Sequence, residues 1–493
     1  MQSEMLRKAR EYERENREKA RTALPAFHVT GGVGWINDPN GFSVYRGEYH
    51  LFFQYYPYDI TWGPMHWGHV KTKDFVRWEY LPAALAPDAA YDKDGCFSGS
   101  AVEMPDGLQR LLYTGVRKEQ RPDGSIAEFQ TQCAATGDGI DFEKTDLNPV
   151  IDGSMLPAGG STVDFRDPKL WREGESCYAV VANLCPDGAG AILLYESPDA
   201  LHWHFVSTLS RGDVSLSGMW ECPDFFQLDG KDVLLHSAHE MRTAGLEFHP
   251  GDGTVCHIGR LDKASHTLTD EVIQTIDYGL DFYAPQTLET PDGRRVMIGW
   301  MQSWASSRSG RPDLPFFGQM SFPRELRIVN GRLCQQPVRE LEAYRRDRAS
   351  HENVHVTDWV SLPGVSGRVL DMTVCIRPEA HGGYRRFRLR LAEGEGLYTE
   401  LTVLPEEGIL RMDRLQSGYV HDIVHVREMP VTFRDGELEL RILMDKYSLE
   451  LFTNGGERAA SMTIYTPLTA DGIRISADGG ALVDVEKYDI VLD

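Results

Sequence analysis

Short apolar runs separated by turn-forming residues make up most of the chain after Phe27. Examples are YHLFFQYY, RLLYTGV, CYAVVANL and AILLYES, and Gly, Pro, Asp and Asn stand between such runs. Runs of this length and texture predict β-strands. No helical period interrupts them before about residue 335, which argues against the alternating strand and helix units of a doubly wound sheet. The pattern therefore predicts a large all-β region.

A weak repeat divides this region into units of about 62 residues. Its pattern is Ser/Thr-x-Asp-x-x-x-Trp at 72–78 and 197–203, with Phe in place of Trp at 136–142. Asp262 comes at the next interval without the aromatic partner. An Asp turn followed by a strand-initiating aromatic suits a recurring strand–turn–strand unit. The period gives about five units, and β-propellers have about 4–8 blades, so we expect a five-bladed β-propeller over residues 27–333.

Two segments have helical patterns. Residues 4 to about 22 lack Gly and Pro and pair Glu with Lys or Arg at four-residue spacing, which predicts a solvated helix in an N-terminal extension, residues 1–26. Behind Pro337, an apolar or aromatic residue recurs at every third position. This second pattern predicts a helical linker over residues 334–352.

Alternating apolar and polar positions return in the last part of the chain. Runs such as RVLDMTVCI, RRFRLRL and ELELRILM alternate, and Gly455-Gly456 after SLELFTN is a hairpin signal. Antiparallel strands of this kind predict a β-sandwich domain over residues 353–493. The expected fold class is all-β, with a five-bladed propeller followed by a C-terminal sandwich and preceded by a short helix.

Composition and charge narrow the classes of function. With 51 Lys and Arg against 74 Asp and Glu, the formal net charge is −23, and so acidic a protein repels the phosphates of nucleic acid. Eight Cys include no C-x-x-C pair, which gives no sign of a disulfide framework or a thiolate zinc site. The first twenty residues hold no apolar run of signal-peptide or membrane-span length. We expect a cytoplasmic protein that binds neither nucleic acid nor membranes.

Three acidic residues stand in tight, Pro-bearing contexts next to strand runs. They are Asp38 in WINDPNG, Asp167 in FRDP and Glu221 in WECPD. Any one of them alone is explained by turn formation. Because Pro excludes the helical region for the residue before it, such a context also suits a carboxylate that must point in one direction. At one end of a propeller channel the three side chains can converge.

Taken together, these segments resemble glycoside hydrolase family 32, the β-fructofuranosidases. The family's W-M-N-D-P-N-G block appears as WINDPNG with Ile36 for Met, its R-D-P block as Arg166-Asp167-Pro168 and its E-C-P block as Glu221-Cys222-Pro223, in the family's order. Further matches are Phe52-Phe53-Gln54-Tyr55, Trp62-Gly63, Trp67-Gly68-His69, Phe97-Ser98-Gly99-Ser100, Phe282-Tyr283-Ala284-Pro285-Gln286 and Pro323-Arg324-Glu325-Leu326. The family's fold, a five-bladed propeller followed by a sandwich, coincides with the architecture expected from the repeat.

The resemblance implies a retaining β-fructofuranosidase that acts on sucrose, short fructo-oligosaccharides or sucrose 6-phosphate. Asp38 would be the nucleophile that forms a fructosyl-enzyme, Glu221 the acid and base, and Asp167 the transition-state stabiliser. The reacting carboxyl groups of a retaining enzyme should sit about 5–5.5 Å apart. Glu221 would need a raised pKa, which an apolar wall and negative neighbours would supply.

The matching motifs also imply which residues hold the sugar. These are Asn37, Gln54, Trp62, Phe97, Ser98 and Arg166. Arg166 would in addition tune the carboxylates electrostatically, while each aromatic could instead pack between blades. His66 and His69 form an H-x-x-H pair, which we assign to packing and turn bonding and not to zinc. The expected site uses neither a metal nor another cofactor.

Alternative functions stay open at this stage. A sugar-binding propeller without catalysis would lack a carboxylate, whereas a polymer-preferring fructanase or a fructosyltransferase would share all three. An inverting arabinanase-type enzyme also uses two Asp and one Glu, but the WINDPNG and ECP blocks argue against it. Tyr56-Pro57 departs from the family's usual Asn-Pro, which leaves the leaving-group preference open. The sandwich could shield the propeller, bind glycan or mediate a homo-oligomer.

Overall fold

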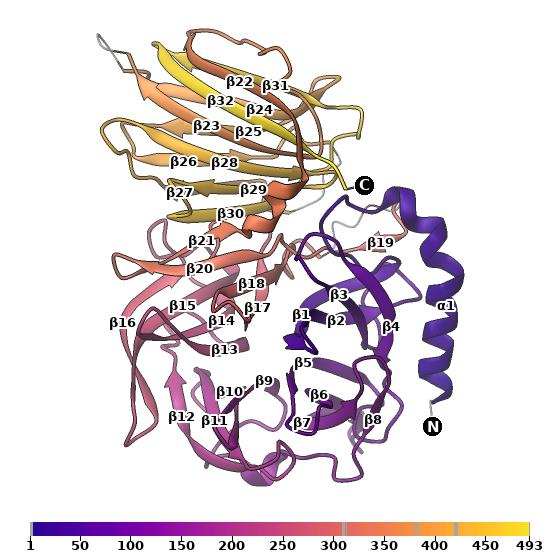
Figure 1. The fold of residues 1–493 in the computed structure, drawn as a ribbon. Coiled ribbons are helices and arrows are strands. Elements are labelled where there is room, and N and C mark those ends of the chain that lie inside the picture. Colours follow the sequence, from indigo (N-terminus) through magenta and orange to yellow (C-terminus); the bar gives the residue numbers. More distant parts are fainter. Residues whose placement is uncertain (1–2, 308–310, 312, 380–382, 419–422, 493) are drawn as a thin grey trace.

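A propeller and a sandwich, stacked on one another, form the two bodies of the structure (Figure 1). The computed structural model describes residues 3–307, 311, 313–379, 383–418 and 423–492. In Figure 1 the sandwich lies above the propeller, and α1 (Glu4–Ala20) runs along the outside of the propeller. Among the described residues, no helix is long and apolar enough to cross a membrane. The two stacked β bodies confirm the all-β class and the order of propeller and sandwich.

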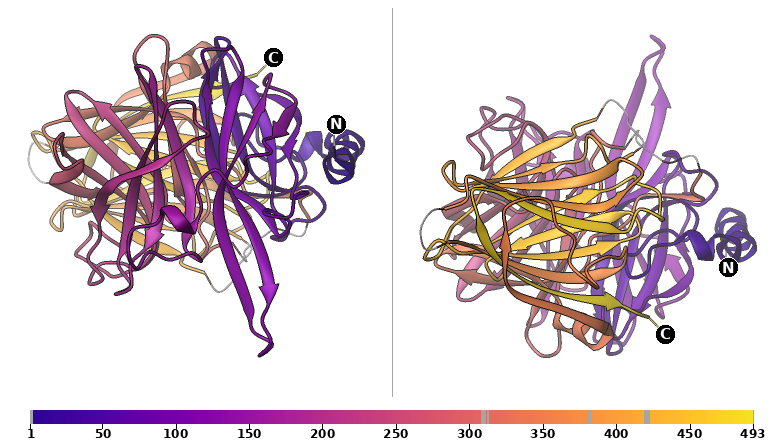
Figure 2. Two further views of the ribbon diagram at one scale, coloured as in Figure 1. Left: turned by 90° about the horizontal axis from the view of Figure 1, so that it is seen from below. Right: turned by 90° about the horizontal axis from the view of Figure 1, so that it is seen from above.

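Five antiparallel sheets, counted over the described residues, make the blades of the propeller. The first strand of each blade contacts the first strands of the two neighbouring blades, so these five strands surround the axis. The first blade consists of β1 (Gly34–Tyr45), β2 (Glu48–Tyr56), β3 (His66–Thr72) and β4 (Glu79–Leu85), and the second of β5 (Gly95–Glu103), β6 (Gln109–Gln120), β7 (Ile126–Gly137) and β8 (Phe142–Lys144). The third consists of β9 (Phe165–Glu173), β10 (Ser176–Leu184), β11 (Gly190–Ser197) and β12 (His204–Arg211), and the fourth of β13 (Trp220–Leu228), β14 (Lys231–Met241), β15 (Gly251–Asp262) and β16 (Thr267–Thr275). The fifth consists of β17 (Tyr283–Glu289), β18 (Arg295–Trp300), β20 (Arg324–Val329) and β21 (Arg332–Pro337). The hairpin of β6 and β7 stands out from the body in both views of Figure 2.

The aspartates of the sequence repeat occupy the same place in four blades, the turn between the third and fourth strands. In each turn the carboxylate accepts two backbone N–H groups of the following residues at 2.8 to 3.0 Å, and the aspartates concerned are Asp74, Asp138, Asp199 and Asp262. These are local turns closed by the side chain itself. The repeat thus marks the same turn in four successive blades, which is why its period equals the length of a blade.

The ring is closed where the fifth blade meets the first. The short strand β19 (Phe316–Phe317) pairs in parallel with the start of β1, and the ring of Phe317 stacks on Trp35 with 4.4 Å between centroids. The N–H of Met320 also donates to the carbonyl of Val29 at 2.8 Å. Closure pairs the sheet edge that β1 would otherwise expose.

The C-terminal body is a sandwich of two antiparallel sheets, counted over the described residues. The larger sheet consists, in order, of β22 (Arg345–Val356), β32 (Ala481–Ile490), β23 (Leu370–Pro378), β28 (Leu438–Asp445), β29 (Ser448–Thr453) and β30 (Arg458–Thr463), and the smaller of β27 (Val426–Pro430), β26 (Ile409–Asp413), β25 (Leu397–Leu404), β24 (Arg386–Gly394) and β31 (Gly472–Asp478). Their inner faces form one apolar core that includes Leu389, Leu440 and Val483, all fully buried. The Gly455-Gly456 hairpin joins β29 to β30 as expected.

The helical linker predicted over residues 334–352 is wrong. Strand β21 runs to Pro337 within the fifth blade, a 3₁₀ helix covers only Arg339–Tyr344, and β22 starts at Arg345. Apolar residues at every third position match the three residues per turn of a 3₁₀ helix and not the 3.6 of an α-helix. Val338 and Leu341 are fully buried at these positions, so burial explains the spacing without a longer helix.

The N-terminal helix is confirmed, but it is only half solvated. A short 3₁₀ turn (Arg21–Ala23) follows it. Leu6, Ala9 and Glu13 are buried on the face towards β4. The carboxylate of Glu13 accepts the N–H of Ala83 at 3.0 Å and the guanidinium of Arg17 at 2.6 Å. The bond to Ala83, together with the one that Arg17 donates to the carbonyl of Leu81 at 3.0 Å, attaches the helix to the outer strand of the first blade.

Buried charged side chains join the two bodies. Arg324 of β20 donates to Glu450 of the sandwich and, at 2.9 Å, to Asp277 of the propeller. His28 donates through Nδ1 to Asp445 and through Nε2 to Glu450, both at 2.9 Å. All five side chains are inaccessible to solvent. Each charge is paired, as burial requires.

His28 gives this interface a pH dependence that unfolding measurements can detect. Burial alone lowers the pKa of His28, but hydrogen bonds and charges of Asp445 and Glu450 outweigh it and raise the pKa to about 9. The stabilisation is therefore complete below the unfolded pKa of about 6.5 and is lost as the pH rises to about 9. We expect the melting temperature to fall between pH 7 and pH 9.5, by the equivalent of about 2 kcal/mol.

The matched variant is His28→Gln, which has no titratable ring. In calorimetry at a series of pH values it should start from a lower melting temperature and lose the alkaline decline. A decline of equal size in the variant would contradict the assignment to His28.

Candidate active site

All three predicted carboxylates lie on strands next to the propeller axis, Asp38 on β1, Asp167 on β9 and Glu221 on β13. At each of them the pairing with the next strand of the blade shifts register. The shifts fall between Ile36 and Pro39, between Arg166 and Lys169, and between Glu221 and Asp224. Pro168 and Pro223 lie inside their bulges and Pro39 borders its own, and a Pro has no N–H to give to the ladder. The Pro-bearing contexts therefore serve to turn the carboxylates out of the regular strand.

Cys222 links the two aspartates. Its thiol lies 3.5 Å from Asp38 Oδ2 and 3.6 Å from Asp167 Oδ2, and its backbone N–H donates to Asp167 Oδ2 at 3.0 Å. Both Asp167 and Cys222 have left-handed backbone, with φ of 65° and 48°. Such strained conformations persist only where the surrounding structure enforces them. The arrangement brings carboxylates from the first and third blades to one thiol of the fourth.

Asp38 is held by two further donors. The hydroxyl of Ser98 donates to Oδ2 at 2.6 Å, and the side-chain amide of Asn37 donates to Oδ1 at 3.1 Å. Asn37 is itself oriented because its Oδ1 accepts from Trp35 Nε1 at 2.8 Å. Burial raises the pKa of Asp38, the charge of Glu221 adds to this effect, and the two donors oppose it.

Glu221 accepts three hydrogen bonds from side chains. Arg166 Nε donates to Oε1 at 2.9 Å, while the Tyr283 hydroxyl at 2.8 Å and His239 Nε2 at 2.6 Å face Oε2. Burial alone raises the pKa of Glu221, but Arg166 and His239 outweigh it and lower the pKa below its usual value. The expectation of a raised pKa is thus wrong for this arrangement, because the cationic groups of Arg166 and His239 lie within 2.9 Å of the Glu221 oxygens. The pKa of Asp167 is raised instead, like that of Asp38, through burial and the charge of Glu221.

The residues predicted to hold the sugar fall into two groups. Asn37, Ser98 and Arg166 contact the carboxylates directly. Gln54 is buried in the first blade and donates to the carbonyl of Cys96, two residues before Ser98, at 2.9 Å. Trp62 is 43% exposed and lies edge-to-face with Phe97, their centroids 6.1 Å apart. Trp62 is therefore accessible, whereas Phe97 is partly buried and packs against the apolar cluster that includes Trp35 and Cys222.

The H-x-x-H pair serves packing. His66 Nδ1 bonds to the carbonyl of Pro64, and His69 Nε2 to His50 Nδ1, both at 2.9 Å. Among the described residues, no group of three or more His, Cys, Asp or Glu side chains has the arrangement of a metal site.

Sequence reasoning missed His239 and Tyr283 as neighbours of Glu221. A signal for His239 was present, because β13 and β14 form a hairpin in which Glu221 pairs with Ser237. Counting back across the Asp229-Gly230 turn would have brought His239 near Glu221. Tyr283 lies on β17 in the next blade, and only the packing of the fifth blade against the fourth brings it there.

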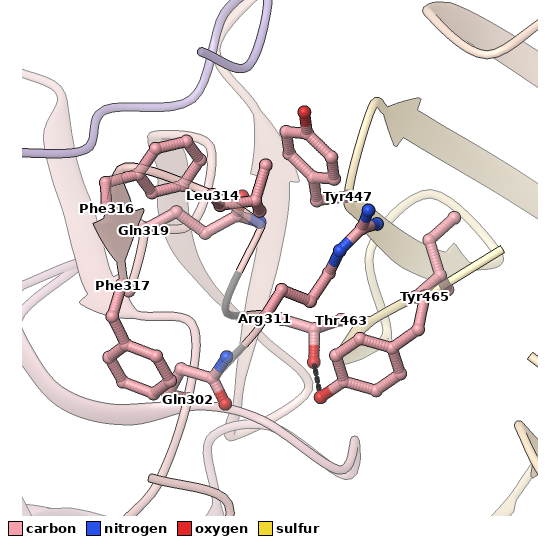
Figure 3. Close-up of a pocket in the computed structure, with 11 residues that line it drawn as sticks. Gln302, Arg311, Leu314, Phe316, Phe317, Gln319, Tyr447, Thr463 and Tyr465 are labelled. Atoms are coloured by element: carbon pink, nitrogen blue, oxygen red, sulfur yellow. Dashed lines mark hydrogen bonds between the residues drawn. The ribbon is translucent and has the colours of Figure 1, made fainter. Parts of the chain in front are cut away.

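A separate cavity of about 40 Å³ lies between the propeller and the sandwich (Figure 3). Gln302, Arg311, Tyr447 and Tyr465 line it, and in Figure 3 the hydroxyls of Tyr465 and Thr463 are joined by a hydrogen bond of 2.9 Å. None of the three carboxylates lines it. It is distinct from the cluster around Cys222.

The chain is similar to known proteins along nearly its whole length. Residues 28–337 match the family model "Glycosyl hydrolases family 32 N-terminal domain", and residues 340–491 match "Glycosyl hydrolases family 32 C terminal". A sucrose-6-phosphate hydrolase of Zymomonas mobilis is 33% identical over 94% of this chain and 90% of its own, and a raffinose invertase of Escherichia coli is 36% identical over 91% and 90%.

Solved structures agree with these matches. A β-fructofuranosidase of Bombyx mori superposes with a TM-score of 0.82 at 31% identity, covering 98% of both chains. A sucrose-6-phosphate hydrolase of Lactobacillus gasseri has the same fold, with a TM-score of 0.83 at 24% identity over 98% of this chain and 96% of its own. With both family models matched in order and the three acidic motifs gathered around one thiol, this chain belongs to glycosyl hydrolase family 32.

Proposed function

We propose that this glycosyl hydrolase is a retaining β-fructofuranosidase that releases fructose from small sugars, sucrose and sucrose 6-phosphate first among them. The observation that carries the proposal is the buried cluster in which Cys222 bridges Asp38 and Asp167 while Glu221 accepts from Arg166 and His239. The names of the relatives, sucrose-6-phosphate hydrolases, an invertase and a β-fructofuranosidase, support the substrate class.

Asp38 is the nucleophile in this proposal. Its bonds to Ser98 and Asn37 hold the carboxylate in one orientation, which is what attack on a single carbon requires. A carboxylate oxygen attacks C2 of the fructosyl group, and the bond from C2 to the leaving oxygen breaks through a transition state with oxocarbenium character. Water later opens the fructosyl ester and gives fructose with retained configuration.

Glu221 is the acid and base. It protonates the leaving oxygen in the first step and removes a proton from the attacking water in the second. Asp167 does not react; it grips hydroxyls of the fructose ring and stabilises the positive charge that develops there. Gln54 and Arg166 add polar contacts to the sugar, and the pair of Trp62 and Phe97 supplies an apolar wall for the pyranose or chain beyond it.

A panel of substrates tests the proposal. Purified protein is incubated with sucrose, sucrose 6-phosphate, a kestose-type oligosaccharide and inulin, and free fructose is assayed. We expect release from the small sugars, and the ratio of kcat/KM for sucrose 6-phosphate and sucrose identifies the preferred leaving group. No release from any of the four would refute the proposal, and a preference for inulin would favour a fructanase.

Glu221→Gln should separate the two halves of the reaction. We expect kcat on sucrose to fall by about 10²–10⁴-fold, the usual worth of general acid–base catalysis. Formation of the fructosyl-enzyme from p-nitrophenyl β-D-fructofuranoside should fall far less, because nitrophenolate leaves without protonation. The measurement is the burst of nitrophenol.

The configuration of the product tests retention separately. In methanol, the wild-type product should be methyl β-D-fructofuranoside, and the α-anomer would contradict retention.

A further inference from the structure

His239 is clamped between two carboxylates from neighbouring strands. Its Nε2 lies 2.6 Å from Glu221 Oε2, and its Nδ1 lies 3.0 Å from Asp252 Oδ1. The far oxygen of Asp252 accepts the backbone N–H of Ala305 at 3.1 Å, so this carboxylate is itself held in place. The imidazole is therefore fixed in rotation and in the direction of both ring nitrogens.

The clamp determines where protons reside. A neutral imidazole has one N–H donor and one bare nitrogen, but here both nitrogens face carboxylate oxygens. Either both nitrogens carry protons, or the Glu221 oxygen carries one that it shares with Nε2. Burial by itself lowers the pKa of His239, but Glu221 and Asp252 outweigh it and raise the pKa to about 10. The pair of Glu221 and His239 thus keeps one proton over the whole neutral range.

The other groups around the pair favour that proton on the ring. Glu221 also accepts from Arg166 of β9 and from Tyr283 of β17, and three donors stabilise its ionised form. The ring of Tyr283 lies 5.9 Å from that of His239. An ionised Glu221 cannot protonate a leaving group, so a general acid in this position needs a proton source within reach.

We propose that His239, oriented by Asp252, stores the proton that Glu221 delivers to the leaving group and receives it back in the second step. This inference rests on the proposed function of the site. In the first step the proton passes from His239 Nε2 to Glu221 and on to the leaving oxygen, as Asp38 forms its bond to C2. In the second step water gives its hydroxyl to C2, Asp38 departs as carboxylate, and the proton returns through Glu221 to Nε2.

A pH profile distinguishes this role from a merely structural one. The proton store keeps the general acid supplied until the pair loses its shared proton, so wild-type kcat/KM on sucrose should stay flat to about pH 9 or above. Without the ring, Glu221 ionises alone beside Arg166. We expect His239→Gln, which can still donate one hydrogen bond to Glu221, to move the alkaline limb down by at least one pH unit and to lose more than tenfold in kcat/KM at pH 9 relative to pH 7.

Two further variants sharpen the test. Asp252→Asn removes the carboxylate charge that faces Nδ1 of His239. It should shift the alkaline limb of the pH profile in the same direction as His239→Gln, but by a smaller amount. His204→Gln removes a surface histidine that faces Glu196 at 3.5 Å and should leave the profile unchanged. With p-nitrophenyl β-D-fructofuranoside, fructosyl-enzyme formation should have the same alkaline limb in the wild type and in His239→Gln. If the alkaline limb of kcat/KM on sucrose is the same in His239→Gln as in the wild type, the proposal is overturned.

A titration that needs no turnover keeps the inference separable from the proposed activity. In protein labelled with ¹³C at histidine Cε1, the resonance that disappears in His239→Gln should report an imidazolium up to about pH 9. A ring that is already neutral at pH 7 would overturn the proton store, whatever substrate the enzyme takes. Absence of fructose release with an intact imidazolium signal would instead refute the proposed function.

Discussion

Asp38→Asn should abolish hydrolysis while the protein stays folded. Asn has the same shape and still accepts a hydrogen bond through its carbonyl oxygen, but the amide is no nucleophile at C2. Since the fructosyl ester cannot form, we expect kcat on sucrose to fall by at least about 10⁴-fold, as for the loss of other catalytic nucleophiles. The substitution also removes one of three buried negative charges, so the melting temperature should not drop.

The matched control is Asp187→Asn. Asp187 is exposed and forms an ion pair with Arg211 on the surface of the third blade. Ion pairs on the surface contribute little to the free energy of unfolding. Its activity should equal that of the wild type. Fructose is assayed for all three proteins under saturating sucrose, and calorimetry verifies that each is folded. Undiminished release by Asp38→Asn would remove Asp38 from the mechanism and with it the proposed function.

Arg324→Met should be the most damaging single change to stability. The guanidinium is fully buried and donates to Asp277, Glu450 and Ser461, which lie on both sides of the interface between the bodies. Met fills a similar volume but leaves two buried carboxylates without this partner. Breaking a buried ion pair from one side costs about 3–5 kcal/mol. We expect a melting temperature lower by several degrees, and earlier loss of sandwich packing in limited proteolysis.

Arg348→Met is the control for this prediction. Arg348 pairs with Glu486 on the sandwich surface, and both side chains are largely exposed, so its loss should cost less than about 1 kcal/mol. Equal melting temperatures for Arg324→Met and Arg348→Met would show that the buried network contributes nothing beyond packing.

The blade pattern was readable from the sequence because its signals are local. A side chain that closes its own turn, as Asp74 and Asp199 do, needs only its nearest neighbours in the chain. The same holds for the Pro-bearing bulges at Asp38 and Asp167. The linker was misread because three-residue spacing is shared by a 3₁₀ turn and one face of an α-helix, and only the buried positions of Val338 and Leu341 distinguish them.

By itself, the sequence determined the all-β architecture and the period of the blades, and it singled out three acidic residues that the fold brings to one cluster. The tertiary structure alone decided their protonation. Glu221 accepts from Arg166, 55 positions earlier, and from Tyr283, 62 positions later, and no local pattern records such contacts. A pKa depends on every charge and donor that packs around a buried group. Which neighbours those are is decided when adjacent blades pack against each other.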